Sequence, residues 1–122
     1  MYSSETSLHM GGYHGTDLRS AERIAVEGFL EINGDIFFAP LDNLTFAQSH
    51  GERRAREIGD AEYGVVQAMF PAKRLELGMH GDQIQIPASE IGRITVVALR
   101  IYSTEQARLI LTKTRDQLQS DA

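Results

Sequence analysis

Three prolines mark where this chain of 122 residues can form strands. Proline has no backbone N–H to donate to a neighbouring strand, so it stands at the end of a strand and not inside it. Each proline follows an apolar run with the composition of a buried strand. These runs are 35–39 before Pro40, 62–70 before Pro71 and 83–86 before Pro87.

Two more strands are expected at the two ends of the chain. Residues 8–13 form the first, in which Gly11 and Gly12 indicate a bulge or the close approach of another backbone. Residues 92–102 carry enough aliphatic side chains for a central strand.

The first predicted helix lies between the strand ending at residue 13 and the strand at 35–39. Thr16 or Asp17 can cap its N-terminus, and Gly28 supplies a left-handed residue at its C-terminus, with Phe29 folding back onto it. Helical spacing gives this helix an inner face made of Leu18, Ala21, Ile24 and Ala25.

Two further helices are predicted. One begins at Asp42 or Asn43 and ends at Gly59, and Gly51 is expected to interrupt it near its middle. Its apolar stripe contains Leu44, Ala47, Gly51, Ala55 and Ile58. The last helix opens at residues 103–106, a capping-box sequence, and buries one face. That face contains Ala107, Ile110, Leu111 and Leu118.

This mixed order of helices and strands favours an α+β domain over a doubly wound parallel sheet. The length suits one domain over residues 1–122, with flexible ends at 1–7 and 119–122. No stretch of eighteen apolar residues is present, so no membrane span is expected. The first residues lack the pattern of a secretory signal, although export as the end of a larger protein stays possible.

The composition excludes several kinds of chemistry. The chain has no cysteine, so disulfides, thiolate zinc sites and cysteine nucleophiles are excluded. Its four histidines do not have the spacing of a metal site, and no metal is expected. A net charge of −5 argues against broad capture of nucleic acid. The basic cluster of Arg53, Arg54 and Arg56 is either a solvated helix face or a phosphate-binding patch.

Three short runs contain residues that could bind a ligand. His14 stands at a strand end beside Gly15, where the imidazole can hydrogen-bond a hydroxyl and the glycine backbone can approach a ligand closely. Phe37 and Phe38 must point to opposite faces of their strand, so one can be core while the other stacks on a flat ring. Taken singly, each run also suits a purely structural role.

The third run places Gln83 and Gln85 on one face of a short strand, away from Ile84 and Ile86. These amides could meet solvent or converge on the hydroxyls of a ligand. A neutral amide can neither take a proton as a general base nor stabilise a cation as a carboxylate would.

Together, the runs 13–16, 36–39 and 83–87 resemble the motifs of the ADP-ribosyltransferase fold of the diphtheria-toxin and poly(ADP-ribose) polymerase type. The resemblance implies a split antiparallel sheet with flanking helices, and a site for NAD. In it, His14, Gly15 and Thr16 match the motif that binds the nicotinamide ribose and carboxamide. Phe37 matches the aromatic residue that stacks on nicotinamide, with Phe38 beside it and Phe46 and Ala47 on the following helix.

Gln83 departs from this family, because it stands where the family has a catalytic glutamate. The glutamine keeps a hydrogen bond to the ribose but loses the charge that supports an oxocarbenium-like transition state. The domain is then a weak or specialised transferase, a non-catalytic binder, or an enzyme silenced by an engineered substitution. A register shifted by one would make Asp82 the carboxylate, and Glu90 also lies near in sequence.

The resemblance implies cleavage of the nicotinamide–ribose bond of NAD and transfer of ADP-ribose to a protein or nucleic acid. The short chain is similar to toxin domains at the ends of secreted bacterial effectors, which implies an immunity or antitoxin protein as a further partner. Such a protein would be cytoplasmic or delivered into a target cell. The alternatives are an inactive module that binds NAD, ADP-ribose or a partner, and an RNA 2′-phosphotransferase-like enzyme.

Overall fold

The computed structural model describes residues 9–30, 34–71, 76–77 and 83–121. The strands are β1 (His9–Asp17), β2 (Ile36–Pro40), β3 (Glu62–Pro71), β4 (Glu76–Leu77), β5 (Ile84–Ile86), β6 (Thr95–Ser103) and β7 (Leu109–Thr114). The helices are α1 (Leu18–Glu27), α2 (Leu44–Glu57) and α3 (Arg115–Asp121), with a 3-10 helix, η3 (Ala88–Arg93), between β5 and β6.

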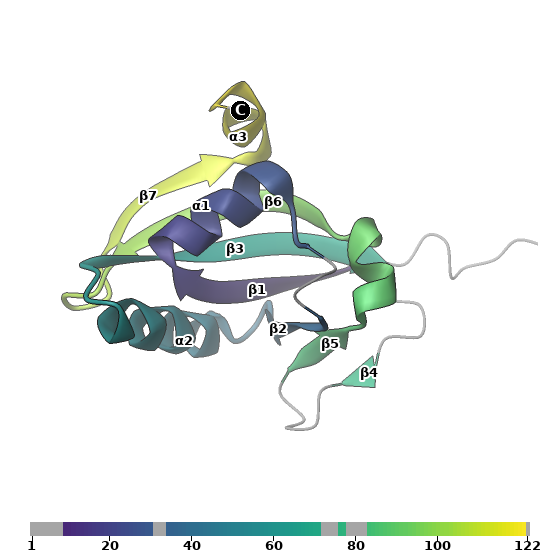
Figure 1. Ribbon diagram of the computed structural model, residues 1–122, viewed down its shortest axis with the longest axis horizontal. Coiled ribbons are helices and arrows are strands. Elements are labelled where there is room, and N and C mark those ends of the chain that lie inside the picture. The colour runs from purple at the N-terminus through teal and green to yellow at the C-terminus, as the bar shows by residue number, and fades with distance from the viewer. Residues whose placement is uncertain (1–8, 31–33, 72–75, 78–82, 122) are drawn as a thin grey trace, which may run out of the picture.

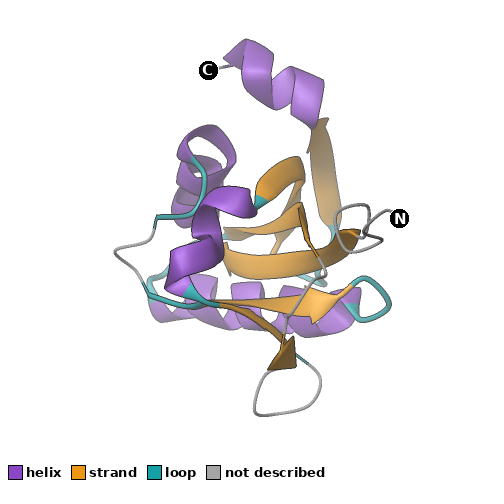
Figure 2. Ribbon diagram, turned by 90° about the vertical axis from the view of Figure 1, so that its right-hand side faces the viewer, coloured by secondary structure: helices purple, strands orange, loops and turns teal. Residues whose placement is uncertain are grey.

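The strands form one antiparallel sheet in the order β4-β5-β2-β1-β3-β6-β7. Helices α1 and α2 cover opposite faces of this sheet (Figure 1). The short helix α3 follows the edge strand β7 at the C-terminal end of the chain (Figure 2). The predicted α+β class, with an antiparallel sheet and flanking helices, is confirmed.

Side chains alternate along β3 between two cores, one under each helix. Val66, Ala68 and Phe70 pack in the larger cluster with Ala21 of α1. Tyr63 and Val65 point the other way and pack with Ala47 and Ala55 of α2, among others. A strand that buries both of its faces needs apolar residues at successive positions, which is the pattern of the predicted run 62–70.

Helix α1 has both of its predicted ends. The Asp17 side chain accepts a hydrogen bond from the Ser20 N–H, and Gly28 ends the helix at φ 82°. Phe29 is buried after this glycine, as expected. Burial by itself would raise the pKa of Asp17, but hydrogen bonds from the Ser20 N–H and the Thr16 hydroxyl outweigh it and hold that pKa below its ordinary value.

Helix α2 is more regular than the sequence indicated. Asn43 caps it and Gly59, at φ 75°, follows its end, both as predicted. The expected interruption at Gly51 is wrong, because the helix continues through this residue. A side chain at position 51 would come within 2.7 Å of the Tyr63 ring and 3.2 Å of the Thr16 backbone. The glycine therefore allows α2 to pack close against β1 and β3, and this packing offsets the low helix propensity of glycine.

The C-terminal region differs most from its prediction, because residues 109–114 form strand β7 and not a helix. The expected helix cap is a hairpin turn in which the Ser103 N–H donates to the Arg108 carbonyl at 2.8 Å. Gln106 and Ala107 both have positive φ, which suits a tight turn between antiparallel strands. The helix starts only at Arg115, and of its predicted inner face only Leu118 is buried.

Smaller corrections concern the ends of elements. Strand β1 continues to Asp17, beyond the predicted residue 13, since it pairs with β3 along its whole length. Strand β6 starts at Thr95, because residues 88–93 form η3. Residues 119–121, expected to be flexible, continue α3. The predicted flexible segment 1–7 lies outside the described residues.

Candidate ligand-binding pocket

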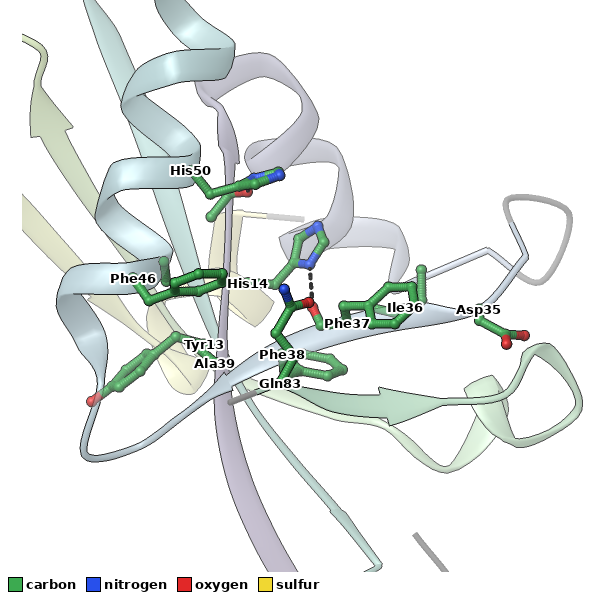
Figure 3. Close-up of a pocket in the computed structure, with 12 residues that line it drawn as sticks. Tyr13, His14, Asp35, Ile36, Phe37, Phe38, Ala39, Phe46, His50 and Gln83 are labelled. Atoms are coloured by element: carbon green, nitrogen blue, oxygen red, sulfur yellow. Dashed lines mark hydrogen bonds between the residues drawn. The ribbon is translucent and has the colours of Figure 1, made fainter. Parts of the chain in front are cut away.

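The pocket lies where strand β1 separates from strand β2. On its other side β1 pairs with β3 at nine consecutive residues, from His9 to Asp17. Toward β2 it pairs only at Gly12 and Tyr13. Beyond Tyr13 the two backbones part, and a side chain bridges them: the Nδ1 atom of His14 lies 2.9 Å from the Phe37 carbonyl oxygen (Figure 3).

The opening between the two strands has a volume of about 190 Å³. Residues from β1, β2 and α2 line it, together with Asp35 before β2 and Gln83 before β5. They are Tyr13, His14, Gly15, Asp35, Ile36, Phe37, Phe38, Ala39, Phe46, Ala47, His50 and Gln83. The three sequence runs that carried the functional prediction therefore meet at one pocket.

His14 is held in one tautomer and one orientation. A carbonyl oxygen can only accept, so the bond to Phe37 requires the hydrogen of a neutral ring to be on Nδ1. The rings of Phe29 and Phe38 contact the imidazole edge-on, at centroid distances of 5.3 and 5.9 Å. Burial lowers the pKa of His14, the bond to Phe37 opposes this, and the positive charge of a protonated His50 would lower the pKa further.

A neutral His14 keeps the lone pair on Nε2. Since the structure gives this atom no hydrogen bond among the described residues, it can accept one from the hydroxyl of a ligand.

His50 is a second histidine of the pocket, which the sequence suggested only as a possible metal ligand. Its Nδ1 lies 2.9 Å from the Gly15 carbonyl oxygen and donates to it. Figure 3 shows the ring reaching from α2 toward β1, on the opposite side of His14 from Phe37. The spacing of four residues between Phe46 and His50 puts both on one face of α2, and this was the signal that could have indicated His50.

Gly15 is where α2 touches β1. A Cβ atom at this position would lie 1.8 Å from the Ala47 carbonyl oxygen, so no other residue fits. Its own carbonyl accepts from His50, while the adjacent Thr16 hydroxyl donates to Asp17 at 3.1 Å and does not line the pocket. Packing thus accounts for the glycine, and helix capping accounts for the threonine, whether or not either one touches a ligand.

The two phenylalanines of β2 face opposite ways, as predicted. Phe38 is fully buried and contacts the rings of Phe29 and Phe70 in the core. Phe37 has 42% of its surface exposed and lines the pocket, and Phe46 of α2, which also lines it, is 38% exposed. Phe37 is therefore free to stack on a ligand, while Phe38 supports His14 from behind.

Gln83 lines the pocket from the residue just before β5. Ile84 and Ile86 are buried while Gln83 and Gln85 are only partly buried, which confirms the predicted alternation. The Gln85 side chain donates to Asp35 at 2.7 Å, and the same carboxylate accepts from the Ala88 N–H at 3.0 Å. Gln83 has no such partner among the described residues, so its amide can reach a ligand.

Asp35 is the one carboxylate among the described lining residues, and sequence reasoning did not propose it for the site. Both of its oxygens accept hydrogen bonds that hold β5 and η3, so it is a structural acceptor. Glu90 is ion-paired with Arg93 at 3.4 Å on η3 and does not line the pocket. Asp82, the other carboxylate considered, lies outside the described residues.

In the part of the chain that the structure describes, no three His, Asp or Glu side chains gather in a way that could bind a metal ion. None of the helices formed by these residues has the length and apolar character that a membrane span needs.

Comparison of the chain with protein-family models, curated proteins and solved structures gave no match.

Proposed function

We propose that this chain is an ADP-ribosyltransferase-like domain that binds NAD in the pocket between β1 and β2. The observation that carries the proposal is the meeting of His14, Phe37 and Gln83, from three separate parts of the chain, at one opening in an antiparallel sheet. The three-motif resemblance requires these residues to share a site, although they are 23 and 46 positions apart in sequence.

These three lining residues have properties that suit a nicotinamide riboside. The exposed Phe37 ring offers a face to the flat nicotinamide. The Nε2 atom of a neutral His14 accepts from a ribose hydroxyl, and the amide of Gln83 can donate to or accept from another. Apolar walls with a few oriented polar groups are typical of small-molecule sites.

In the proposed reaction, the bond between nicotinamide and ribose breaks and nicotinamide leaves with the bonding electrons. An acceptor nucleophile then adds to the ribosyl cation and loses its proton to solvent. The protein contributes positioning, because Phe37 holds the leaving nicotinamide and His14 holds the ribose. Gln83 would lie beside the ribosyl cation and would stabilise it only with the dipole of its neutral amide. The chain as written should therefore bind NAD more readily than it cleaves it.

A domain that binds NAD or ADP-ribose without turnover is the second candidate. It is favoured by the hydrogen bonds that occupy Asp35, the one carboxylate among the described lining residues. A protein or nucleic-acid acceptor, an immunity protein, and delivery as a toxin or effector into a target cell belong to the transferase proposal. A cytoplasmic location suits both candidates.

The test combines binding with turnover. NAD should raise the unfolding temperature of the parent chain, because a ligand of the native state stabilises it by mass action. At a hundred times the dissociation constant, the free energy of unfolding should rise by about 2.7 kcal/mol. Gln83→Glu should raise the release of nicotinamide from NAD by roughly a hundredfold, since one electrostatic group at a transition state contributes about 10²–10³ in rate. Adding His14→Ala should abolish that release.

The matched control is Gln119→Glu, which makes the same charge change on the exposed face of α3, away from the pocket. It should leave both measurements as in the parent. Release of nicotinamide by Gln83→Glu that persists without His14 would contradict the proposed site. Binding of NAD without turnover in any variant would favour the second candidate, and no binding at all would reject both.

A further inference from the structure

The pocket between β1 and β2 is too small to contain a whole dinucleotide. Its volume of about 190 Å³ is below the roughly 300–1,000 Å³ of pockets that enclose a drug-sized ligand. A second hollow of about 240 Å³ lies next to it along α2, lined by Phe46, Ser49, His50 and Arg53. Phe46 and His50 line both, so the two hollows meet at these side chains.

Helix geometry determines the direction of the second hollow. Phe46, His50 and Arg53 are four and three residues apart and lie on one face of α2. At a rise of about 1.5 Å per residue, Arg53 lies about 10 Å along the helix axis from Phe46. A ligand that leaves the pocket past Phe46 and His50 therefore runs toward the guanidinium of Arg53.

Arg53 differs from its neighbours in having an unused charge. Arg54 pairs with Asp17 at 3.8 Å and with Glu57 at 3.6 Å. Arg56 pairs with Glu52 at 3.0 Å and donates to the Thr104 carbonyl. Arg53 is exposed and forms no hydrogen bond or ion pair with any residue that the structure describes. The basic cluster of the sequence thus separates into two structural arginines and one that is available to a ligand.

We propose that Arg53 binds the diphosphate of the dinucleotide whose nicotinamide end occupies the pocket, with the Ser49 hydroxyl and His50 beside it. This inference rests on the proposed function and adds the part of the ligand that the first pocket cannot hold. The planar guanidinium forms two parallel hydrogen bonds to phosphate oxygens and keeps its charge at any physiological pH. The Nδ1 bond of His50 to Gly15 leaves Nε2 on the ligand side.

Two ligands that differ in their phosphates test this assignment by titration calorimetry. Arg53→Gln should weaken NAD binding by about tenfold, because hydrogen bonds to charged groups contribute more than neutral ones. The same variant should leave binding of nicotinamide riboside, which has no phosphate, within twofold of the parent. Arg53→Lys should recover part of the lost NAD affinity, since it restores the charge but not the two parallel bonds.

Arg23→Gln is the matched control, because Arg23 is also exposed but belongs to α1 on the opposite face of the sheet. It should bind both ligands like the parent. Equal binding of NAD by Arg53→Gln and by the parent would overturn this inference and leave the proposed function standing. Equal weakening of both ligands would also overturn it, because Arg53 would then act on the whole pocket. If the parent binds neither ligand, the proposed function fails together with the inference.

Discussion

The two edges of strand β1 differ in what surrounds them. The edge toward β3 is paired along all nine residues, and side chains of both cores close over it. The edge toward β2 is paired at only two residues and then opens into the pocket. A single strand thus provides both the rigid centre of the sheet and one wall of a candidate binding site.

The difference shows how side chains can bind backbone carbonyls at an opening in a sheet. Where β2 departs from β1, the imidazole of His14 takes the Phe37 carbonyl and His50 takes the Gly15 carbonyl. Two side chains thus supply hydrogen-bond donors to backbone carbonyls in the region where β1 and β2 are not paired. The two histidines therefore hold the backbone at the opening, and both line the pocket.

The largest expected effect on stability comes from substituting the core residue of β2, in comparison with its neighbour on the pocket side. Phe38→Ala should lower the free energy of unfolding by about 3–5 kcal/mol, because the ring is fully buried and leaves a cavity. Phe37→Ala, one residue away and 42% exposed, should cost less than about 1 kcal/mol but weaken NAD binding. Urea unfolding and calorimetry of both variants check this contrast. Equal loss of stability would mean that Phe37 is a core residue.

The next effect concerns the contact of α2 with β1. Gly15→Ala should destabilise the protein by about 3 kcal/mol, because the new methyl group would overlap the Ala47 carbonyl and only the backbone could yield. The matched control is Gly92→Ala, where no atom lies within 4 Å of the added carbon. Thermal unfolding of the two variants measures the difference. If Gly15→Ala unfolds like the control, the helix does not press against the strand.

The smallest effect is a dependence of stability on pH that His14 introduces. Its pKa is lower in the folded protein than its ordinary value of 6.5, so the unfolded chain binds more protons between these two pKa values. The stability from a neutral His14 is therefore complete above pH 6.5 and is lost as the pH falls toward the folded pKa. His14→Gln should flatten this part of the profile in urea unfolding measured from pH 7.5 to pH 5. A profile unchanged by the substitution would show that His14 is not the group responsible.

Much of the fold was predictable because its signals are local. The cap at Asp17, the left-handed Gly28 and the prolines after three apolar runs act on the few residues beside them. The helix predicted from residue 103 to residue 118 was wrong for the opposite reason. Its signals were a serine that could cap a helix and apolar residues at helical spacing, and the pairing of β7 with β6 stabilises a strand instead. Such pairing depends on packing against the neighbouring strand of the hairpin, which helical spacing within one segment does not report.

The site was predictable in part. The motifs indicated His14, Phe37 and Gln83, and the structure brings these three to one pocket, whereas their proposed roles toward NAD remain predictions. Thr16 does not line the pocket, and Phe38 lines it from within the core. His50 and Asp35 join it only through folding, because neither belongs to a motif.

By itself, the sequence determined the residue types and their order along the chain: the capped helix after β1, the pair of phenylalanines, and the glutamine four residues before Pro87. Only the tertiary structure decided where β1 and β2 part, which of three neighbouring arginines keeps a free charge, and that a histidine from α2 shares the pocket with His14. The physical reason is that chain order and caps are set by neighbours in sequence, whereas an opening in a sheet is set by packing between residues far apart.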